Sequence, residues 1–246
     1  KPYRMEGVPI WLYDVVEPDQ LFSAADYYRL AWMAIEDIWR RKKLPILVGG
    51  TGFYIKAVVE GIGSLGIPPD WKLRKQLSNL AIEDLRKKLK ELSFERWEIM
   101  NESDRQNPRR LIRAIEIASK IGSSKLKAKS YNAKLKIKNC LFLGLTASHK
   151  VLYARIDKRV ERQMEMGAER EVEKLLKQYR WENSVLQVTF GYQEWRPYFE
   201  KKSTREEVIE RWKYDEHAYA RRQMTWFKKA FRQARGHWFD ITQKGW

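Results

Sequence analysis

Apolar residues recur at helical spacing over much of this chain. Ser23 and Asp26 form a capping-box pattern, and apolar positions then repeat every three or four residues to Trp39, which predicts a helix ending near Arg41. The same spacing predicts a nearly continuous helical stretch over 70–121, with leucines at 77, 80, 85, 89 and 92 as its buried stripe. Further helices are expected over residues 53–60, 149–166, 169–179 and 192–200, and from Thr204 toward Arg235.

Two short apolar runs interrupt the helical pattern and predict buried strands. Residues 45–48 read Pro-Ile-Leu-Val and end at Gly49-Gly50, and a second apolar run covers 138–146. A short apolar run that ends at a glycine turn and leads into a helix is typical of a strand in a parallel sheet.

The order of these elements predicts an α/β fold whose parallel sheet is interrupted by a helical insert. The Gly- and Pro-rich stretch over 61–69 marks the boundary, and the polar, lysine-rich stretch over 122–136 is expected to be a loop. The predicted division is a core α/β part at 1–69, a helical insert at 70–136, and a core continuation with basic C-terminal helices at 137–246.

The charge balance of the chain indicates an anionic binding partner. Lys and Arg number 49 against 32 Asp and Glu, a net charge of +17. Such an excess favours nucleic acid or an anionic membrane surface, and no apolar run reaches the roughly 20 residues of a membrane span. We therefore expect a cytoplasmic, nucleic-acid-binding protein. Cys140, the single cysteine, lies in an apolar run and is expected to be a buried structural thiol.

The turn Gly49-Gly50-Thr51-Gly52 is the first candidate site. At a strand-to-helix junction it can present backbone N–H groups and the Thr51 hydroxyl to an anion or a polarised oxygen. The same glycines are equally consistent with a tight turn that has no ligand. No G-x-x-x-x-G-K-[ST] motif occurs in the chain, so the turn is not a complete nucleotide cradle.

Arginines gather at the start of the helix that follows Pro108. Arg109, Arg110 and Arg113 lie at the end of a helix that disfavours cations, so an anion is expected to compensate them. The anion can be a nucleic-acid phosphate or, for Arg113, the Glu116 carboxylate three residues on.

A second arginine stripe lies on the helix predicted over 149–166. Arg155, Arg159 and Arg162 share one helical face and suit pyrophosphate or RNA backbone. Asp157 and Glu161 interleave with them, so a salt-bridged surface helix is the alternative.

The last predicted helix carries the string Arg221-Arg-Gln-Met-Thr-Trp-Phe227. Cations interleaved with aromatic rings suit RNA, through phosphate contacts and base stacking. Core packing is the more common fate of such rings and the alternative for Trp226 and Phe227.

Taken together, these segments resemble the tRNA dimethylallyltransferase (tRNA isopentenyltransferase) family. The matching strings follow in the family's order over nearly the whole chain: Asp14–Asp19, Phe22–Asp26, Leu44–Tyr54, Asn107–Glu116, Gly191-Tyr192 and Arg221–Phe227. The resemblance implies an enzyme that transfers a dimethylallyl group from dimethylallyl diphosphate to N6 of the adenosine 3′ of the anticodon, A37, in tRNAs that read codons beginning with U. It also implies a P-loop kinase-like sheet, a base flipped into a channel, and no membrane.

The resemblance assigns roles to individual residues. It implies that Thr51 is catalytic and that the pyrophosphate is bound by Gly50, Gly52, Arg155 and Arg159. It implies tRNA contacts at Arg74, Gln106, Asn107, Arg109, Arg110, Arg113, Gly191, Tyr192, Gln193 and Arg222. No residue of the chain is assigned to a metal.

Two features of the family pattern are missing from this sequence. The family begins with a strand and a phosphate-binding P-loop, with which Mg²⁺ is expected, and a general-base Asp follows; neither motif is found here. We therefore expect a monomeric, N-terminally truncated member whose sheet lacks its first strand, and which alone is inactive. The alternatives are a catalytically dead tRNA- or RNA-binding module and a fragment of an unrelated nucleotide kinase.

Overall fold

The computed structural model describes residues 3–121, 137, 139–183, 185–234 and 236–243. The chain divides into two compact units, each described by itself. Unit 1 consists of Lys1–Ile55 and Asn139–Trp246, and unit 2 of Lys56–Lys138. The loop expected over 122–136 lies outside the described residues.

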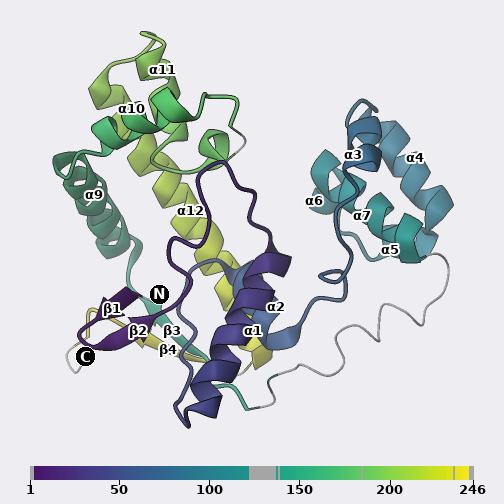
Figure 1. Ribbon diagram of the computed structural model, residues 1–246, viewed down its shortest axis with the longest axis horizontal. Coiled ribbons are helices and arrows are strands. Elements are labelled where there is room, and N and C mark those ends of the chain that lie inside the picture. The colour runs from purple at the N-terminus through teal and green to yellow at the C-terminus, as the bar shows by residue number, and fades with distance from the viewer. Residues whose placement is uncertain (1–2, 122–136, 138, 184, 235, 244–246) are drawn as a thin grey trace. The chain divides into compact units, whose positions relative to one another are not determined.

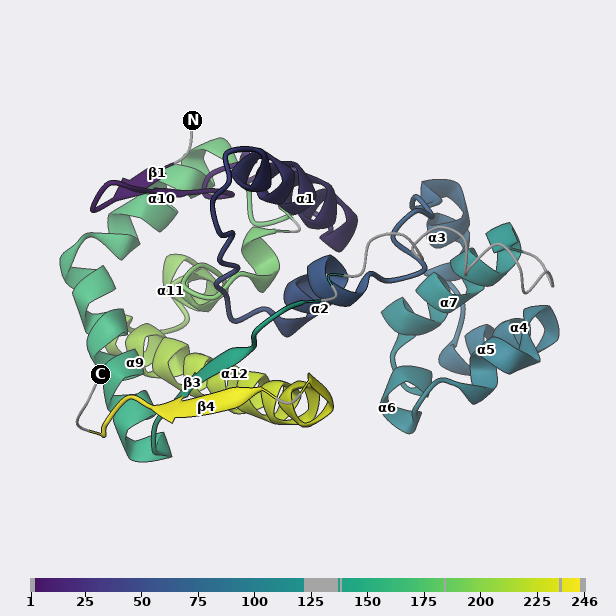
Figure 2. The same cartoon turned by 90° about the horizontal axis from the view of Figure 1, so that it is seen from below.

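The described part of unit 1 contains two small sheets. β1 (Tyr3–Met5) pairs antiparallel with β2 (Val8–Ile10) through a two-residue turn in which Glu6 and Gly7 both have positive φ. Such turns match the twist of the strands they join. β3 (Leu143–Thr146) pairs in parallel with β4 (His237–Asp240), and the two strands lie side by side in Figure 2.

The helices of unit 1 begin at the caps that the sequence predicts. Ser23 and Asp26 form a reciprocal capping box, and Thr204 and Glu207 form another. Both predicted helix starts are therefore confirmed. The helices of unit 1, labelled where there is room in Figure 1, are α1 (Ala24–Arg40), the start of α2 (Gly52–Glu60), α9 (His149–Glu165), α10 (Ala168–Gln178), η1 (Leu186–Val188), η2 (Gln193–Trp195), α11 (Arg196–Phe199) and α12 (Arg205–Ala234).

The core of unit 1 lies where α9, α10 and α12 meet. Trp195 from η2 is fully buried there, between apolar side chains of the three helices. Burying an aromatic ring of this size stabilises a fold by about 2–3 kcal/mol. The buried cluster consists of Val160, Met164, Val172, Trp195, Val208 and Trp212.

Unit 2 is helical throughout its described part, apart from the connections. Its helices are α3 (Trp71–Leu77), α4 (Ile82–Leu92), α5 (Phe94–Glu98), α6 (Glu102–Arg105) and α7 (Pro108–Ile121), together with the end of α2. Leu77, Leu85 and Leu89 of the predicted stripe are buried with Leu111 and Ile115 of α7. Leu80 and Leu92 are exposed, because Leu80 follows the end of α3 and Leu92 is the last residue of α4.

The strand expected at residues 45–48 is not present, and that prediction was wrong. No described residue pairs with this segment, so it lacks the hydrogen-bonded neighbour that a strand requires. Leu44, Ile46 and Val48 are instead exposed, at 82%, 78% and 84%. The large parallel sheet is thus represented among the described residues by β3 and β4 alone.

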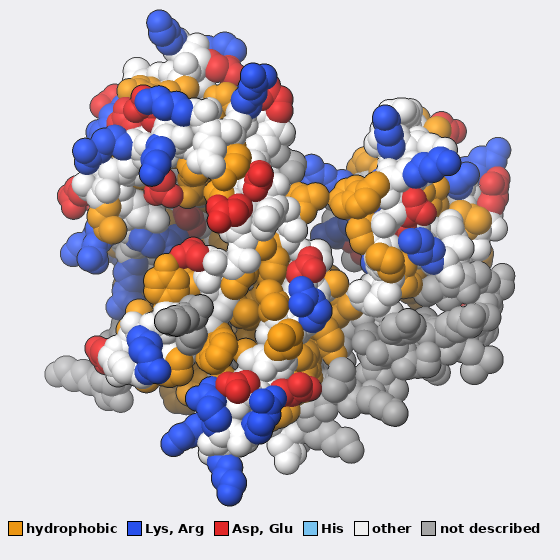
Figure 3. All heavy atoms as spheres, in the orientation of Figure 1, with side chains coloured by type: hydrophobic (Ala, Val, Ile, Leu, Met, Phe, Trp, Pro, Cys, Tyr) orange, Lys and Arg blue, Asp and Glu red, His pale blue; other side chains and the backbone are white. Residues whose placement is uncertain are grey.

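The run around Cys140 also differs from expectation. Cys140 is exposed rather than buried, because it lies before β3 begins at Leu143 and is not part of a paired strand. Strand β3 covers only the end of the predicted strand. Figure 3 shows hydrophobic side chains on the visible surface of unit 1.

No helix in the described ranges is both long enough and apolar enough to cross a bilayer.

Candidate functional site

The glycine turn before α2 packs directly against α12. Nε2 of Gln223 donates a 2.9 Å hydrogen bond to the carbonyl oxygen of Gly50. A Cβ built on Gly52 would lie 2.2 Å from the Trp226 ring, and one on Gly50 would lie 2.1 Å from Gln223 Nε2. Only glycine permits this approach. Two sequence motifs about 170 residues apart are therefore in contact. Close packing against α12 explains why Gly50 and Gly52 are glycines.

Thr51 lies at the start of α2 with its side chain at the surface. Its carbonyl oxygen accepts hydrogen bonds from the N–H groups of Tyr54 at 2.9 Å and Ile55 at 3.2 Å. The first N–H groups of a helix have no acceptor within the helix and favour negative charge nearby. An exposed hydroxyl beside such a helix end can bind a polarised oxygen, so the geometry is compatible with the predicted role of Thr51.

An aromatic stack joins α9 to α12 in unit 1. The Tyr153 ring lies parallel to the His217 ring, with centroids 4.1 Å apart. Asp157 Oδ1 lies 2.8 Å from His217 Nε2, and Arg221 Nη1 donates a 2.9 Å hydrogen bond to the Tyr153 hydroxyl. The spacing of residues along the chain does not indicate these contacts, because residues in two separate helices produce them.

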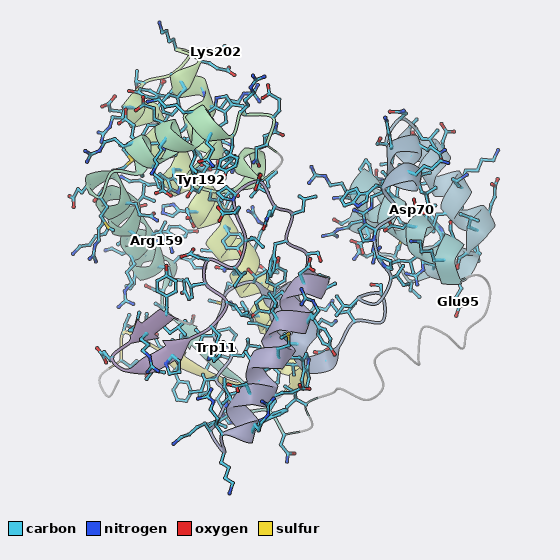
Figure 4. All side chains as sticks on the ribbon, in the orientation of Figure 1. Trp11, Asp70, Glu95, Arg159, Tyr192 and Lys202 are labelled. Atoms are coloured by element: carbon cyan, nitrogen blue, oxygen red, sulfur yellow. The ribbon has the colours of Figure 1, made fainter. Side chains whose placement is uncertain are left out.

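The arginines of α9 have different environments. Arg159, labelled in Figure 4, pairs with Glu216 of α12 at 2.9 Å, and Glu161 pairs with Lys213 at 3.0 Å. Arg155 is exposed and has no acidic partner in the described ranges. The salt-bridged alternative therefore describes Arg159, while Arg155 has no ion pair among the described residues.

Polar groups of the segment after η1 form hydrogen bonds with one another. Gly191 has a φ of 84° and packs on Trp212, where a Cβ would lie 2.6 Å from the ring. Its N–H donates to the buried Glu194 carboxylate at 2.8 Å, and Gln193 donates to the same side chain at 2.9 Å. Burial raises the pKa of Glu194 despite these bonds.

The side chain of Tyr192 is also hydrogen-bonded within unit 1. Its hydroxyl donates to Glu171 Oε1 at 2.7 Å, and burial together with this bond raises the pKa of the phenol. The three predicted tRNA contacts at 191–193 thus lie together in unit 1, with the side chain of Tyr192, labelled in Figure 4, half-buried.

In unit 2 a buried carboxylate organises two of the predicted tRNA contacts. Glu116 is fully buried and accepts from Arg74 Nε and Nη2, both at 2.9 Å, in a bidentate pair. It also accepts from Arg113 Nη1 and from the Asp70 N–H. Arg113 Nη2 donates to the carbonyl oxygens of Ser64 and Ile67 at 2.9 Å each. The Glu116 cluster therefore ties α3, α7 and the connection before α3 together.

The electrostatics of this cluster favour the ionised acid. Burial alone raises the pKa of the Glu116 carboxyl, but hydrogen bonds from Arg74, the Asp70 N–H and Arg113 outweigh it and hold the pKa at about 2. The anion that the sequence required near Arg113 is thus part of the protein.

The α6–α7 junction places the other predicted contacts of unit 2. Asn107 Oδ1 accepts the Arg110 N–H at 3.2 Å, with Pro108 as the first residue of α7. Arg110 forms an ion pair with Asp104, and Gln106 donates to Glu102 at 2.9 Å.

Arg109 and Arg222, two of the predicted tRNA contacts, have no ion pair among the described residues. Arg109 is exposed with no acidic partner in the described part of unit 2. Arg222 of α12 is also exposed, and its guanidinium lies 5.8 Å from the Tyr219 ring centroid.

Charge is distributed unevenly between the units. Residues 56–138 contain 20 Lys and Arg and 10 Asp and Glu, a net charge of +10 out of the +17 of the whole chain. Figure 3 shows Lys and Arg side chains on the visible face of unit 2. The helical unit is therefore the more basic one per residue.

Comparison with known proteins decides the family. The IPP transferase family model matches residues 1–230. The tRNA dimethylallyltransferase of Roseiflexus castenholzii is 41% identical, with 93% of this chain and 74% of the relative covered. That of Anoxybacillus flavithermus is 35% identical, with 96% and 74% covered. The chain belongs to the IPP transferase family. Its relatives are tRNA dimethylallyltransferases, a class of prenyltransferase enzymes.

Solved structures of IPP transferases agree with this assignment. The tRNA isopentenylpyrophosphate transferase of Bacillus halodurans superposes with a TM-score of 0.64 at 33% identity, covering 96% of this chain and 73% of that one. A eukaryotic dimethylallyltransferase acting on tRNA has a TM-score of 0.73 at 26% identity, covering 96% and 60%. The resemblance found from sequence motifs is confirmed.

The Mg²⁺ expected for the family has no ligand set in the described part of this chain. No three His, Cys, Asp or Glu side chains of the described ranges are grouped in a way that could hold a metal ion. Mg²⁺ is often held by one or two protein oxygens together with substrate phosphates, so the expectation of Mg²⁺ stays a prediction.

Proposed function

We propose that this IPP transferase family chain acts in the transfer of a dimethylallyl group from dimethylallyl diphosphate to N6 of A37 in tRNAs that read codons beginning with U. In this reaction C1 of the prenyl group forms a bond to N6, the C1–oxygen bond to diphosphate breaks, and N6 loses a proton. The observation that supports the proposal most directly is the packing of Gly50 and Gly52 against Gln223 and Trp226.

The proposed role of Thr51 follows from that packing. Gln223 and Trp226 contact the turn on both sides of Thr51, so the backbone that carries its exposed hydroxyl has a set position at the start of α2. A hydroxyl held in place can orient a reacting group without the cost of ordering it during the reaction. Arg155, exposed on α9, is the proposed pyrophosphate ligand whose guanidinium is uncommitted among the described residues.

The proposed tRNA surface includes Arg109 and Arg222, the exposed cations described above. Arg74, Arg110 and Arg113 carry ion pairs within unit 2 and have a structural role in addition to any contact with RNA. The cytoplasmic location and the monomeric state remain predictions from the sequence.

The test compares transfer with binding. The chain is assayed with tRNA and labelled dimethylallyl diphosphate, alone and joined to the part of the Roseiflexus relative that the chain does not cover. Thr51→Ala is expected to lower the rate of transfer by tenfold to a hundredfold while the Kd for tRNA changes less than threefold, because a positioning contact acts in the transition state.

Ser78→Ala is the matched control, since Ser78 is an exposed hydroxyl in unit 2 that bonds only the Lys75 carbonyl oxygen among the described residues. Equal losses of transfer and binding in Thr51→Ala would contradict the proposed role. The alternative, an RNA-binding module without catalysis, predicts tight tRNA binding and no transfer in either assay.

A further inference from the structure

Trp71 is an exposed aromatic ring on the most basic part of the molecule. It is the first residue of α3, directly after Asp70, which is labelled in Figure 4, and 59% of it is exposed. Large aromatic rings normally bury most of their surface in protein cores or interfaces. An open tryptophan ring on a charged surface is therefore a candidate contact site.

The ring has a fixed cationic neighbour. The guanidinium carbon of Arg74 lies 5.1 Å from the ring centroid, within the range of a cation–π contact. Arg74 is in turn held by its bidentate pair with the buried Glu116. A guanidinium that the fold holds in place thus lies over the Trp71 ring, and 59% of the residue remains exposed to solvent.

The surroundings of the ring favour RNA over an apolar protein partner. Lys75 is one helical turn after Trp71 on the same face of α3 and is exposed, and Lys72 is exposed beside it. Arg74 Nη1 has no acceptor among the described residues, so it remains available to a phosphate oxygen. An aromatic platform with phosphate-binding groups beside it is how proteins bind unpaired nucleotides.

We propose that Trp71, backed by Arg74 and flanked by Lys75, is a stacking site for one unpaired nucleobase of the tRNA substrate. The proposal deepens the proposed function, on which it rests. Glu116 acts here as a positioning residue, since it orients Arg74 and does not contact the base. A base stacked on the free face of Trp71 completes a guanidinium–indole–base sandwich.

The test uses two RNA probes of equal length and charge. One is a hairpin whose loop carries the fluorescent base 2-aminopurine, and the other is a fully paired duplex. Trp71→Ala is expected to weaken hairpin binding about fivefold to a hundredfold, the range found when one base stack is removed. Binding of the duplex is expected to change less than twofold, because the charge of the surface is unchanged.

Two further variants separate stacking from other contacts. Trp71→Phe keeps an aromatic face and is expected to retain hairpin binding within threefold and the quenching of 2-aminopurine. Trp71→Leu keeps an apolar side chain and is expected to behave like Trp71→Ala. Trp39→Ala is the control, because Trp39 is an exposed tryptophan of α1 in unit 1, and it should leave both probes unaffected.

Each outcome decides between explanations. Hairpin binding that survives in Trp71→Leu overturns stacking in favour of a general apolar contact. Equal weakening of hairpin and duplex assigns the effect to a damaged surface, and unfolding curves of the variants check this directly. If the unmodified chain binds no hairpin, the proposed function fails as well; if it binds and Trp71→Ala binds equally, only the stacking site fails.

Discussion

The helices of unit 2 and the strand β3 of unit 1 differ in how far they cover their apolar residues. Unit 2 buries Leu77, Leu85 and Leu89 of its predicted stripe, whereas β3 of unit 1 exposes Leu143 and Leu145. A helix satisfies its hydrogen bonds within its own sequence, so a small helical unit closes from local patterns plus a few long-range contacts. A strand depends on neighbours from elsewhere in the chain, and its side chains are covered only when those neighbours are in place.

The buried carboxylate of unit 2 gives the sharpest test of this difference. Glu116→Ala leaves two half-buried guanidinium groups and the Asp70 N–H without their acceptor, and is expected to destabilise unit 2 by about 3–5 kcal/mol. Urea unfolding followed by hydrogen exchange in peptides from α3 and α7 measures the loss. Amides of α9 and α12 in unit 1 should exchange as before.

The matched control for this change is Glu83→Ala. Glu83 is 73% exposed and pairs with Arg86 at 3.7 Å, so its removal should cost less than about 1 kcal/mol. A similar loss of stability in both variants would show that the Glu116 cluster is no more than a surface ion pair.

Acid titration tests the same cluster without a mutation. The folded-state pKa of Glu116 is about 2, below the ordinary value of 4.5, so the ionised acid stabilises the fold above the ordinary value and this contribution is lost as pH falls toward 2. The shift corresponds to about 3 kcal/mol. Hydrogen exchange in α3 and α7 should accelerate over this range.

Glu116→Gln supplies the reference for the titration. Its amide does not titrate, so the variant should begin less stable and lose less on acidification than the unmodified chain. Parallel pH profiles of the two proteins would exclude Glu116 as the source of the acid sensitivity.

The contrast between the units also explains what the sequence could predict. The caps at Ser23 and Thr204 and the insert helices follow from residues close in sequence, and the structure has them. The strand expected at 45–48 requires a hydrogen-bonded neighbouring strand, and the pattern of apolar residues within one segment cannot show whether that neighbour exists. The prediction of a buried Cys140 failed for the same reason.

The candidate site was predictable to a similar, partial degree. Motif resemblance selected the glycine turn and α12, which the structure brings together. It did not indicate that Glu116 holds Arg74, since those residues are 42 positions apart and only folding reveals the pair. Two glycines flanking Thr51 were the available signal for a close approach by bulky side chains.

The smallest expected effect concerns that close approach in unit 1. Gly52→Ala places a methyl group 2.2 Å from the Trp226 ring, so the ring or the turn must move. Overpacking of this kind costs about 1–3 kcal/mol, more than the roughly 1 kcal/mol that alanine normally gains over glycine in a helix. Thermal unfolding and the near-ultraviolet circular dichroism of the tryptophans report the loss.

Gly49 provides the matched control, because a Cβ at that position meets no atom within 4 Å. Gly49→Ala should therefore keep the stability of the unmodified chain, or exceed it slightly through reduced freedom of the unfolded state. Combining Gly52→Ala with Trp226→Leu should restore part of the loss, since the smaller side chain makes room for the methyl group. A Gly52→Ala protein as stable as Gly49→Ala would mean that the turn and α12 are not in contact in solution, and the packing on which the proposed position of Thr51 depends would be wrong.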